Sequence, residues 1–257
     1  MIELKNISKK FNAGTVNETE VFNNFNFKVE KGEFVSIIGS NGSGKTTLLN
    51  LIAGSIKQDV GQVLIDGQDI TSQKEHIRAR RFGRVFQDPS KGVASNMTIL
   101  ENLSLADNKG KLFGLTPGIT RKKINEYEDL VASIGLGLED KMNVKMGSLS
   151  GGQRQSISLL MASLTPIEFL ILDEHTAALD PKTADIVMEL TNKIIKEKNL
   201  TALMVTHNLR YALEYGNRLV MMHEGNIVLD RKDEEKKNTE LQEVLNLFNT
   251  ISIECGN

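Results

Sequence analysis

The chain has little cysteine and no long apolar run, and each absence argues against one class of protein. Among 257 residues it has a single cysteine, Cys255, so no disulfide can form within the chain. Secreted domains commonly rely on disulfides, so the cytosol is the expected compartment, and we assign Cys255 no role. No run approaches the roughly 20 apolar residues of a membrane-spanning helix, and the first residues lack a basic segment followed by an apolar stretch. We therefore expect neither a membrane span nor a secretion signal.

An excess of either charge is also absent. The 31 lysines and arginines nearly balance 33 acidic residues, which gives a formal net charge of −2. Proteins that bind nucleic acid usually show a basic excess, so DNA or RNA is not an expected partner. The chain does have 40% hydrophobic residues. At this length that is enough for a full buried core, in one large domain or two small ones.

The most specific feature is the run G-S-N-G-S-G-K-T at residues 39–46, which has the spacing of a phosphate-binding P-loop. In such a loop glycines let successive backbone N–H groups face inward around an anion. Lys45 would reach the β and γ phosphates of a nucleotide, and the Thr46 hydroxyl would bind Mg²⁺. The candidate nucleotide-binding residues here are Gly39, Ser40, Asn41, Gly42, Ser43, Gly44, Lys45, Thr46 and Thr47.

The flanks of this loop support the same interpretation. Residues 34–38 form a short apolar run that predicts a buried strand, and residues 46–53 predict a helix closed by Gly54. A phosphate at the start of that helix would meet its N–H donors and the positive end of its dipole. A chance match in an ordinary glycine-rich turn is expected on the order of one per cent of the time. We reject that alternative.

A second apolar run, residues 169–172, ends in the adjacent carboxylates Asp173 and Glu174. Neighbouring side chains of a strand point in different directions, so the two acids can have different roles. We expect Asp173 to hold Mg²⁺, directly or through water, and Glu174 to polarise an attacking water. A helix cap or surface acid pair is the ordinary alternative. Downstream of a P-loop the catalytic interpretation is favoured.

Gln87 and His207 also follow apolar runs, at residues 84–86 and 202–206. In open α/β sheets such strand ends face the ligand crevice. Gln87 could contact Mg²⁺ and the attacking water, and His207 could donate a hydrogen bond to the γ-phosphate. A histidine at such a place is, taken alone, more often structural. The remaining histidines lack comparable support and are assigned no catalytic role: His76, His175 and His223.

The run L-S-G-G-Q at residues 149–153 is a second glycine-rich turn. Ser150 and Gln153 have the spacing of a capping box, and apolar residues between 157 and 164 continue a helical face, so a helix is expected to begin here. A capping box does not require Gly151 and Gly152 at its centre, whereas close approach of a phosphate to bare backbone does. We therefore predict a second anion site.

Apolar periodicity favours an α/β protein. Alternation within residues 2–29 predicts an antiparallel edge sheet. Three-to-four spacing dominates residues 90–164 and predicts a helical lobe inserted in the core, and residues 234–248 predict an amphipathic helix that packs on the core. Short apolar runs between helical patterns predict the strands of a βα-alternating sheet: residues 63–65, 84–86, 169–172, 202–205, 219–222 and 227–229.

These motifs, in this order, resemble the ATP-binding cassette (ABC) ATPases over nearly the whole chain. The resemblance covers Walker A at 39–46, the Q-loop at Gln87, the signature at 149–153, Walker B at 169–173, the D-loop at 178–180 and the switch histidine at His207. It makes Glu174 the catalytic glutamate. Phe11 matches the aromatic residue that stacks on adenine, usually a tyrosine, although an ordinary edge-strand aromatic is the alternative.

The resemblance implies a P-loop NTPase fold, an ABC ATPase core with an antiparallel β subdomain and an inserted helical subdomain. The expected boundaries are a single domain over residues 1–257, with residues 1–89 and 165–257 forming the core and β subdomain and residues 90–164 the helical subdomain. ATP and Mg²⁺ are the expected cofactors. Two copies would pack head to tail, so that Ser150 and the Gly152 amide of one copy close on the γ-phosphate held by the other.

The resemblance also implies partners. Besides its second copy, the chain would bind transmembrane permease subunits through residues 90–103, at the cytoplasmic face of the membrane. An extracytoplasmic solute-binding protein would complete an importer. His175 stands where the family most often has proline, and the variant D-E-H-T is similar to a subgroup that serves importers, among them aromatic amino-acid systems. Proline would fix the backbone after Glu174, so the local rigidity there is an open question.

Two other classes of protein share part of this pattern. A soluble cassette that remodels DNA or ribosomes is disfavoured because only residues 88–148 separate Gln87 from the signature, where DNA-repair relatives insert a long arm. Ribosome-acting relatives usually carry two cassettes, and this chain has one P-loop. A nucleotide kinase or GTPase would share the P-loop. The signature, the D-loop and His207 argue against it.

Overall fold

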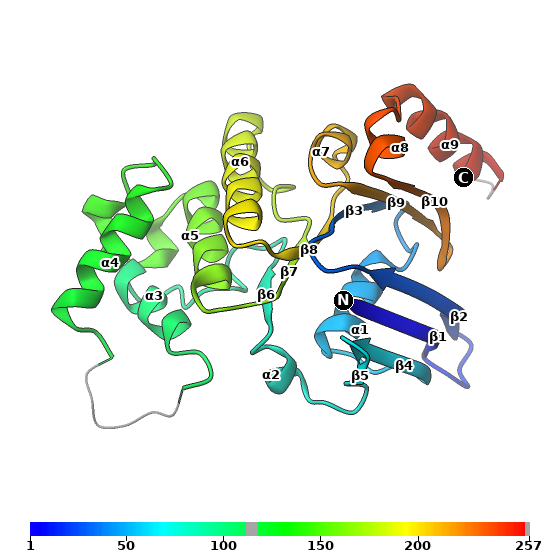
Figure 1. Cartoon of the computed structure of the whole chain (residues 1–257), viewed down its shortest axis with the longest axis horizontal. Helices are drawn as coiled ribbons and strands as arrows, with labels where there is room; N and C mark the ends of the chain where they lie inside the picture. The colour runs from blue at the N-terminus through cyan, green and yellow to red at the C-terminus, as the bar shows by residue number, and fades with distance from the viewer. Residues whose placement is uncertain (112–117, 255–257) are drawn as a thin grey trace. The chain divides into compact units, whose positions relative to one another are not determined.

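The computed structural model describes residues 1–111 and 118–254 (Figure 1). The chain divides into two compact units, which are described separately. The first unit contains Met1–Ala79 and Asn199–Asn257, and the second contains Arg80–Lys198. Cys255, for which the sequence suggested no role, lies outside the described residues.

The first unit contains a four-stranded antiparallel sheet in the order β2-β1-β4-β5. Its strands are β1 (Ile2–Phe11), β2 (Thr19–Val29), β4 (Val60–Ile65) and β5 (Gln68–Asp69). Phe25, Phe27 and Val29 alternate along β2 with exposed neighbours and are buried, and the rings of Phe22 and Phe25 stack at 4.5 Å. The antiparallel edge sheet expected from residues 2–29 is therefore confirmed.

A second sheet in this unit carries the P-loop. β3 (Phe34–Gly39) pairs in parallel with β8 (Thr201–Val205) and with β9 (Arg218–His223), and β10 (Asn226–Lys232) pairs antiparallel with β9. Every residue of β3 is buried, as expected of a strand between two others. The helices of this unit are α1 (Lys45–Ala53), α2 (Glu75–Arg78), α7 (Leu209–Glu214), α8 (Asp233–Lys237) and α9 (Leu241–Glu254).

The sequence predicted one continuous helix over residues 234–248, and this is wrong, because the structure has two helices there. α8 ends at Lys237, and α9 begins at Leu241. The ammonium of Lys236 donates to the carbonyls of Tyr215 and Gly216, which ties α8 to the turn before β9. The apolar face belongs to α9, where Val244 is buried in a cluster with Ile38, Ala212, Leu219 and Met221. The predicted packing on the core is thus confirmed for α9.

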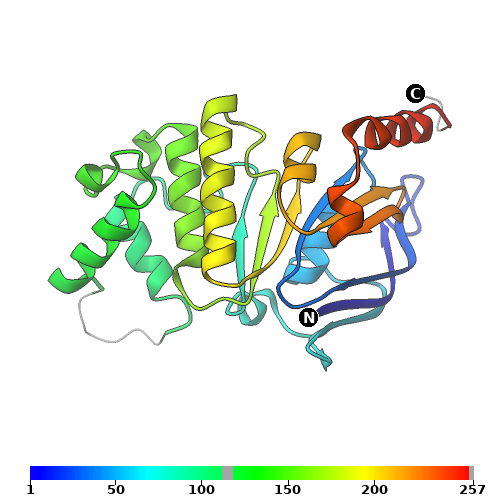
Figure 2. The ribbon, with the colours of Figure 1, turned by 45° about the horizontal axis from the view of Figure 1, so that its top comes forward.

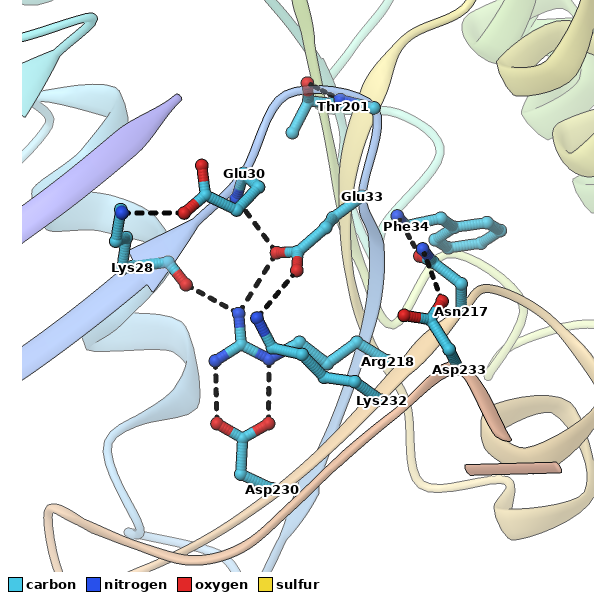
Figure 3. A network of polar contacts seen from close by, with 11 residues as sticks. Lys28, Glu30, Glu33, Phe34, Thr201, Asn217, Arg218, Asp230, Lys232 and Asp233 are labelled. Carbon is cyan, nitrogen blue, oxygen red and sulfur yellow. Dashed lines mark hydrogen bonds and ion pairs between the residues drawn. The ribbon is translucent and has the colours of Figure 1, made fainter. Parts of the chain in front are cut away.

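An ionic network around the buried Arg218 side chain joins strands of the first unit (Figure 3). The Arg218 guanidinium makes two hydrogen bonds to the Asp230 carboxylate, at 2.8 and 2.7 Å, and donates to the Lys28 carbonyl at 2.6 Å. It also contacts Glu33 at 3.1 Å, and Lys232 donates to the same carboxylate at 2.9 Å. Burial raises the pKa of Glu33, but these donors outweigh it and lower that pKa. The Arg218 guanidinium on β9 thus links β10, through Asp230, to β2, through the Lys28 carbonyl.

The second unit is mainly helical around two parallel strands, β6 (Phe82–Val85) and β7 (Phe169–Asp173). Along the chain, the helices of the predicted helical lobe come after β6 and before β7: α3 (Ile99–Asp107), α4 (Arg121–Ala132) and α5 (Gly151–Leu164). Short 3₁₀ turns lie at Glu139–Lys141 and Met146–Ser148. α6 (Pro181–Glu197) follows β7, and α5 and α6 lie side by side in both views (Figures 1 and 2). Within residues 1–111 and 118–254, no helix is both long and apolar enough to cross a bilayer.

Candidate active site

The P-loop links the buried end of β3 to the start of α1. Gly39 has a φ of 151°, and a Cβ there would lie 2.1 Å from the Met222 carbonyl oxygen, so no other residue fits without a backbone shift. Gly42 and Gly44 have φ values of 80° and 99°, in the left-handed region that glycine tolerates. Gly44 is the N-cap of α1 and has no side chain that could occupy the first N–H groups. The start of α1 therefore presents its backbone donors to a ligand.

Lys45 is folded into this loop. Its side chain is buried, and its ammonium donates to the carbonyls of Gly39 at 2.8 Å and Ser40 at 2.7 Å, with the Ser43 hydroxyl at 3.5 Å. These contacts hold the positive charge inside the turn that the sequence assigned to phosphates.

Two histidines of the first unit lie near the P-loop. His207 follows β8 and lines a cavity of about 160 Å³ together with Gly39 and Thr206. Sequence reasoning passed over His223, but its Nδ1 lies 3.3 Å from the Ser40 hydroxyl. The missed signal is that His223 ends an apolar strand, the same feature that singled out Gln87 and His207.

The carboxyl ends of β6 and β7 bring Gln87 and Glu174 together in the second unit. Since the two strands are parallel neighbours, their ends meet at one edge. The Gln87 side-chain amide donates to the Glu174 carboxylate at 3.0 Å. Glu174 itself has a φ of 48°, an uncommon conformation for a side chain of this size. The amide thus fixes one oxygen of the carboxylate that the sequence assigned to catalysis.

Asp173 pairs with a residue that sequence reasoning missed. The Arg84 guanidinium lies 3.3 Å from the Asp173 carboxylate, and its carbon lies 4.7 Å from the centre of the Phe86 ring. Burial raises the pKa of Asp173, and the positive charge of Arg84 opposes that rise. The pair could not be read from the sequence because it depends on the register of β6 against β7, in which Arg84 lies opposite Ile171.

His175 follows Glu174 and is only 2% exposed. Its Nε2 lies 3.1 Å from the hydroxyl of Thr191, which in turn donates to the Val187 carbonyl at 2.7 Å. Burial lowers the pKa of His175 to about 4. The ring therefore lies within the unit as a neutral group.

The turn at residues 149–153 is a complete capping box. The Ser150 hydroxyl accepts from the Gln153 N–H at 3.3 Å, and the Gln153 side-chain oxygen accepts from the Ser150 N–H at 3.1 Å. A Cβ on Gly152 would lie 1.9 Å from Cγ2 of Thr183, so packing within the unit demands this glycine. A Cβ on Gly151 would meet Leu179 at an ordinary 3.6 Å. Of these two glycines, Gly151 is thus the one that has room for a side chain within its own chain.

Phe11 and the candidate metal ligands complete the set. Phe11 ends β1, is 36% exposed, and has the Lys9 ammonium 5.3 Å from its ring centre.

The candidate metal ligands are Thr46, Gln87 and Asp173. They offer hydroxyl, amide and carboxylate oxygens, the donors that Mg²⁺ prefers. Among the described residues no three His, Cys, Asp or Glu side chains gather as in an all-protein metal cage.

Comparison with known proteins decides the family. The family model described as ABC transporter matches residues 22–177, more than half of the chain. The chain belongs to the ABC transporter family. A tyrosine transport ATP-binding protein of Clostridioides difficile is 53% identical over 248 residues, covering 96% of this chain and 98% of that protein. A phosphonates import ATP-binding protein of Lactococcus lactis is 35% identical over 251 residues, covering 95% and 98%.

Solved structures agree with this family. A dimeric ATP-binding cassette in a post-hydrolysis state, bound to ADP and phosphate, has a TM-score of 0.77 and 31% identity, covering 90% of this chain and 98% of that one. The ADP conformation of another ABC transporter cassette has a TM-score of 0.79 and 28% identity, covering 100% and 99%. This ABC protein is an ATPase with the expected P-loop α/β fold. The predicted family, fold class and activity are confirmed.

Proposed function

We propose that this ABC ATPase powers the import of tyrosine or a chemically similar aromatic amino acid through a separate membrane permease. The proposed cargo is supported by the 53% identity, over nearly the full length of both chains, to a tyrosine transport ATP-binding protein. In this proposal the permease selects the cargo and the ATPase supplies the energy. The P-loop and the Gln87–Glu174 pair support the energetic half of the proposal.

ATP binds through the first unit in this proposal. Lys45 and the N–H groups at the start of α1 hold the β and γ phosphates, together with residues 39–44, Thr46 and Thr47. The Phe11 ring stacks on the adenine. Thr46, Gln87 and Asp173 would hold Mg²⁺, which would supply positive charge to the phosphates.

Hydrolysis uses the carboxylate of Glu174. It polarises a water and accepts its proton while the water oxygen attacks the γ-phosphorus in line. The bond between the γ-phosphorus and the bridging oxygen breaks, and ADP leaves with that electron pair. The amide of Gln87 orients Glu174 through the 3.0 Å hydrogen bond. His207 donates to the γ-phosphate and stabilises the developing charge.

Two copies close head to tail around ATP. Ser150, Gly151, Gly152 and Gln153 of one copy complete the γ-phosphate site of the other. Loss of the γ-phosphate removes the contact that favours the closed dimer, so the population shifts to the open state. In this proposal residues 1–89 and 165–257 form the core and β subdomain, and residues 90–164 form the helical subdomain. The helical subdomain transmits the motion to the permease through residues 90–103.

The complete system would operate at the cytoplasmic face of the membrane, with a solute-binding protein on the other side. The test uses the purified protein and its Glu174→Gln variant. We expect the variant to lose at least about a hundredfold in turnover, the scale of a general base, while forming a stable ATP-bound dimer on size exclusion. Normal turnover in the variant would remove Glu174 from its role.

A second experiment tests the cargo and the partners. The native complex is isolated from membranes, its subunits are identified, and ATP-dependent uptake is measured in vesicles with labelled tyrosine and, as a control, labelled phosphonate. Co-purification of a permease and uptake of tyrosine alone support the proposal. Recovery of ribosomal or DNA-bound material would instead support the alternative of a soluble remodelling ATPase.

A further inference from the structure

The backbone conformation of Glu174 needs a support that its own sequence does not supply. Glu174 directly follows β7 and has a φ of 48°. A non-glycine residue in such a region is strained and persists only where its surroundings hold it. One local contact is the Ala177 N–H, which donates to the Glu174 carbonyl at 2.9 Å. The next residue is His175.

The His175 side chain supplies a longer-range anchor. It reaches Thr191 in the third turn of α6, and both side chains are almost fully buried, at 2% and 0% exposure. The Thr191 hydroxyl has one hydrogen, which it donates to the Val187 carbonyl at 2.7 Å. Its oxygen must therefore accept from His175, so the proton of the ring lies on Nε2. The hydrogen bond has one direction and locks one orientation of the ring.

We propose that His175 is a positioning residue for ATP hydrolysis, whose hydrogen bond to Thr191 on α6 holds Glu174 in the orientation that meets Gln87. The inference rests on the proposed role of Glu174. His175 is joined to Glu174 by one peptide bond, so a shift of the His175 backbone changes the direction of the Glu174 side chain directly. The 3.0 Å bond between Glu174 and Gln87 depends on that direction.

An ordinary core histidine would have a different consequence. A group that only fills space affects the free energy of unfolding, and the folded fraction would hydrolyse ATP at the normal rate. A positioning residue changes kcat while the P-loop, which binds ATP, is unaffected. The two roles are distinguished by measuring kcat, KM and the thermal unfolding temperature of each variant and asking which of them changes.

The test uses a matched pair at Thr191. Thr191→Val keeps the shape and removes the acceptor, and Thr191→Ser keeps the hydroxyl. We expect kcat of Thr191→Val to fall about tenfold to a hundredfold, the scale of a misplaced reacting group, with little change in KM for ATP. Thr191→Ser should keep most of the wild-type kcat. Equal kcat in both variants, with both folded, would overturn the proposal.

A second pair acts on the histidine itself and guards against a variant that fails to fold. His175→Gln keeps an N–H donor, and His175→Leu has a similar volume without one. We expect the glutamine variant to retain more kcat per folded molecule than the leucine variant, and equal values would contradict the role. Glu174→Gln is measured alongside. If it turns over normally, the proposed function fails; if it is inactive and Thr191→Val is normal, only the role of His175 fails.

Discussion

Helix α1 begins at a glycine and α5 at a serine, and this difference separates the two glycine-rich turns of the chain. At α1 the N-cap Gly44 leaves the first backbone donors open, and the buried ammonium of Lys45 lies in the loop before them. At α5 the side chains of Ser150 and Gln153 already satisfy two backbone donors of the helix start. The first turn is built to take an anion by itself. The second is satisfied within its own chain and can add only the groups that remain.

The comparison also shows that glycines in similar motifs have different causes. Gly39 and Gly44 are required by backbone conformation and by close approach within the P-loop. Gly152 is required by the contact of α5 with Thr183 of α6, whereas Gly151 has room for a Cβ. Within residues 149–153, therefore, packing inside the chain explains Gly152 but does not explain Gly151.

Loss of Lys45 should have the largest effect on ligand binding. Lys45→Ala removes a charge-assisted contact to phosphate worth roughly 1.5–3 kcal/mol, so ATP affinity should fall about tenfold to a hundredfold. Equilibrium binding of ATP measures it, with Lys31→Ala, at an exposed lysine, as the control. Unchanged affinity in Lys45→Ala would remove the P-loop from the ATP site.

Gly152→Ala should be the most damaging change in the signature turn. The new methyl group would overlap Cγ2 of Thr183, and overpacking of this kind costs about 1–3 kcal/mol of stability. The added change Thr183→Ser removes that methyl group and should restore much of the loss. Denaturant unfolding of the two variants and the wild type measures both effects. A full loss that persists in the double variant would show that the contact with Thr183 is not the cause.

Ser150→Ala should have an intermediate effect. It removes the N-cap of α5, which costs about 1 kcal/mol in free energy of unfolding. Ser150→Thr, which keeps a hydroxyl, should lose less. Urea midpoints of the two variants measure the difference. If they coincide, the capping box does not stabilise the isolated protein.

Gly151→Ala should have the smallest effect on the isolated chain and a selective one on the dimer. We expect a change in unfolding free energy within about 0.5 kcal/mol, as for a surface substitution, because its Cβ meets only Leu179. In the Glu174→Gln background the ATP-bound dimer should nevertheless weaken. Size exclusion at a series of ATP concentrations tests it. A dimer of unchanged affinity would mean that bare backbone at Gly151 is not needed.

Local patterns were enough to predict much of the fold and the P-loop. Residues 34–38 and the glycines after them specify strand, loop and helix within a short stretch, so neighbours in the sequence carry the signal. The contacts of Arg84 with Asp173 and of His175 with Thr191 join residues far apart along the chain. Apolar periodicity contains nothing about such pairings, because they depend on strand register and on how α6 packs. The break between α8 and α9 was missed for the same reason, since Lys236 binds carbonyls about twenty residues earlier.

The central claim is that ATP is shared between the P-loop of one copy and the signature turn of another. The most direct measurement mixes two inactive forms, Lys45→Ala and Ser150→Arg, each also carrying Glu174→Gln. Head-to-tail packing predicts that neither form dimerises well with ATP alone, whereas the mixture forms a mixed dimer with one intact site that retains ATP on size exclusion. A mixture that stays monomeric while Glu174→Gln alone dimerises, or ATP-dependent dimers of each inactive form by itself, would contradict the account.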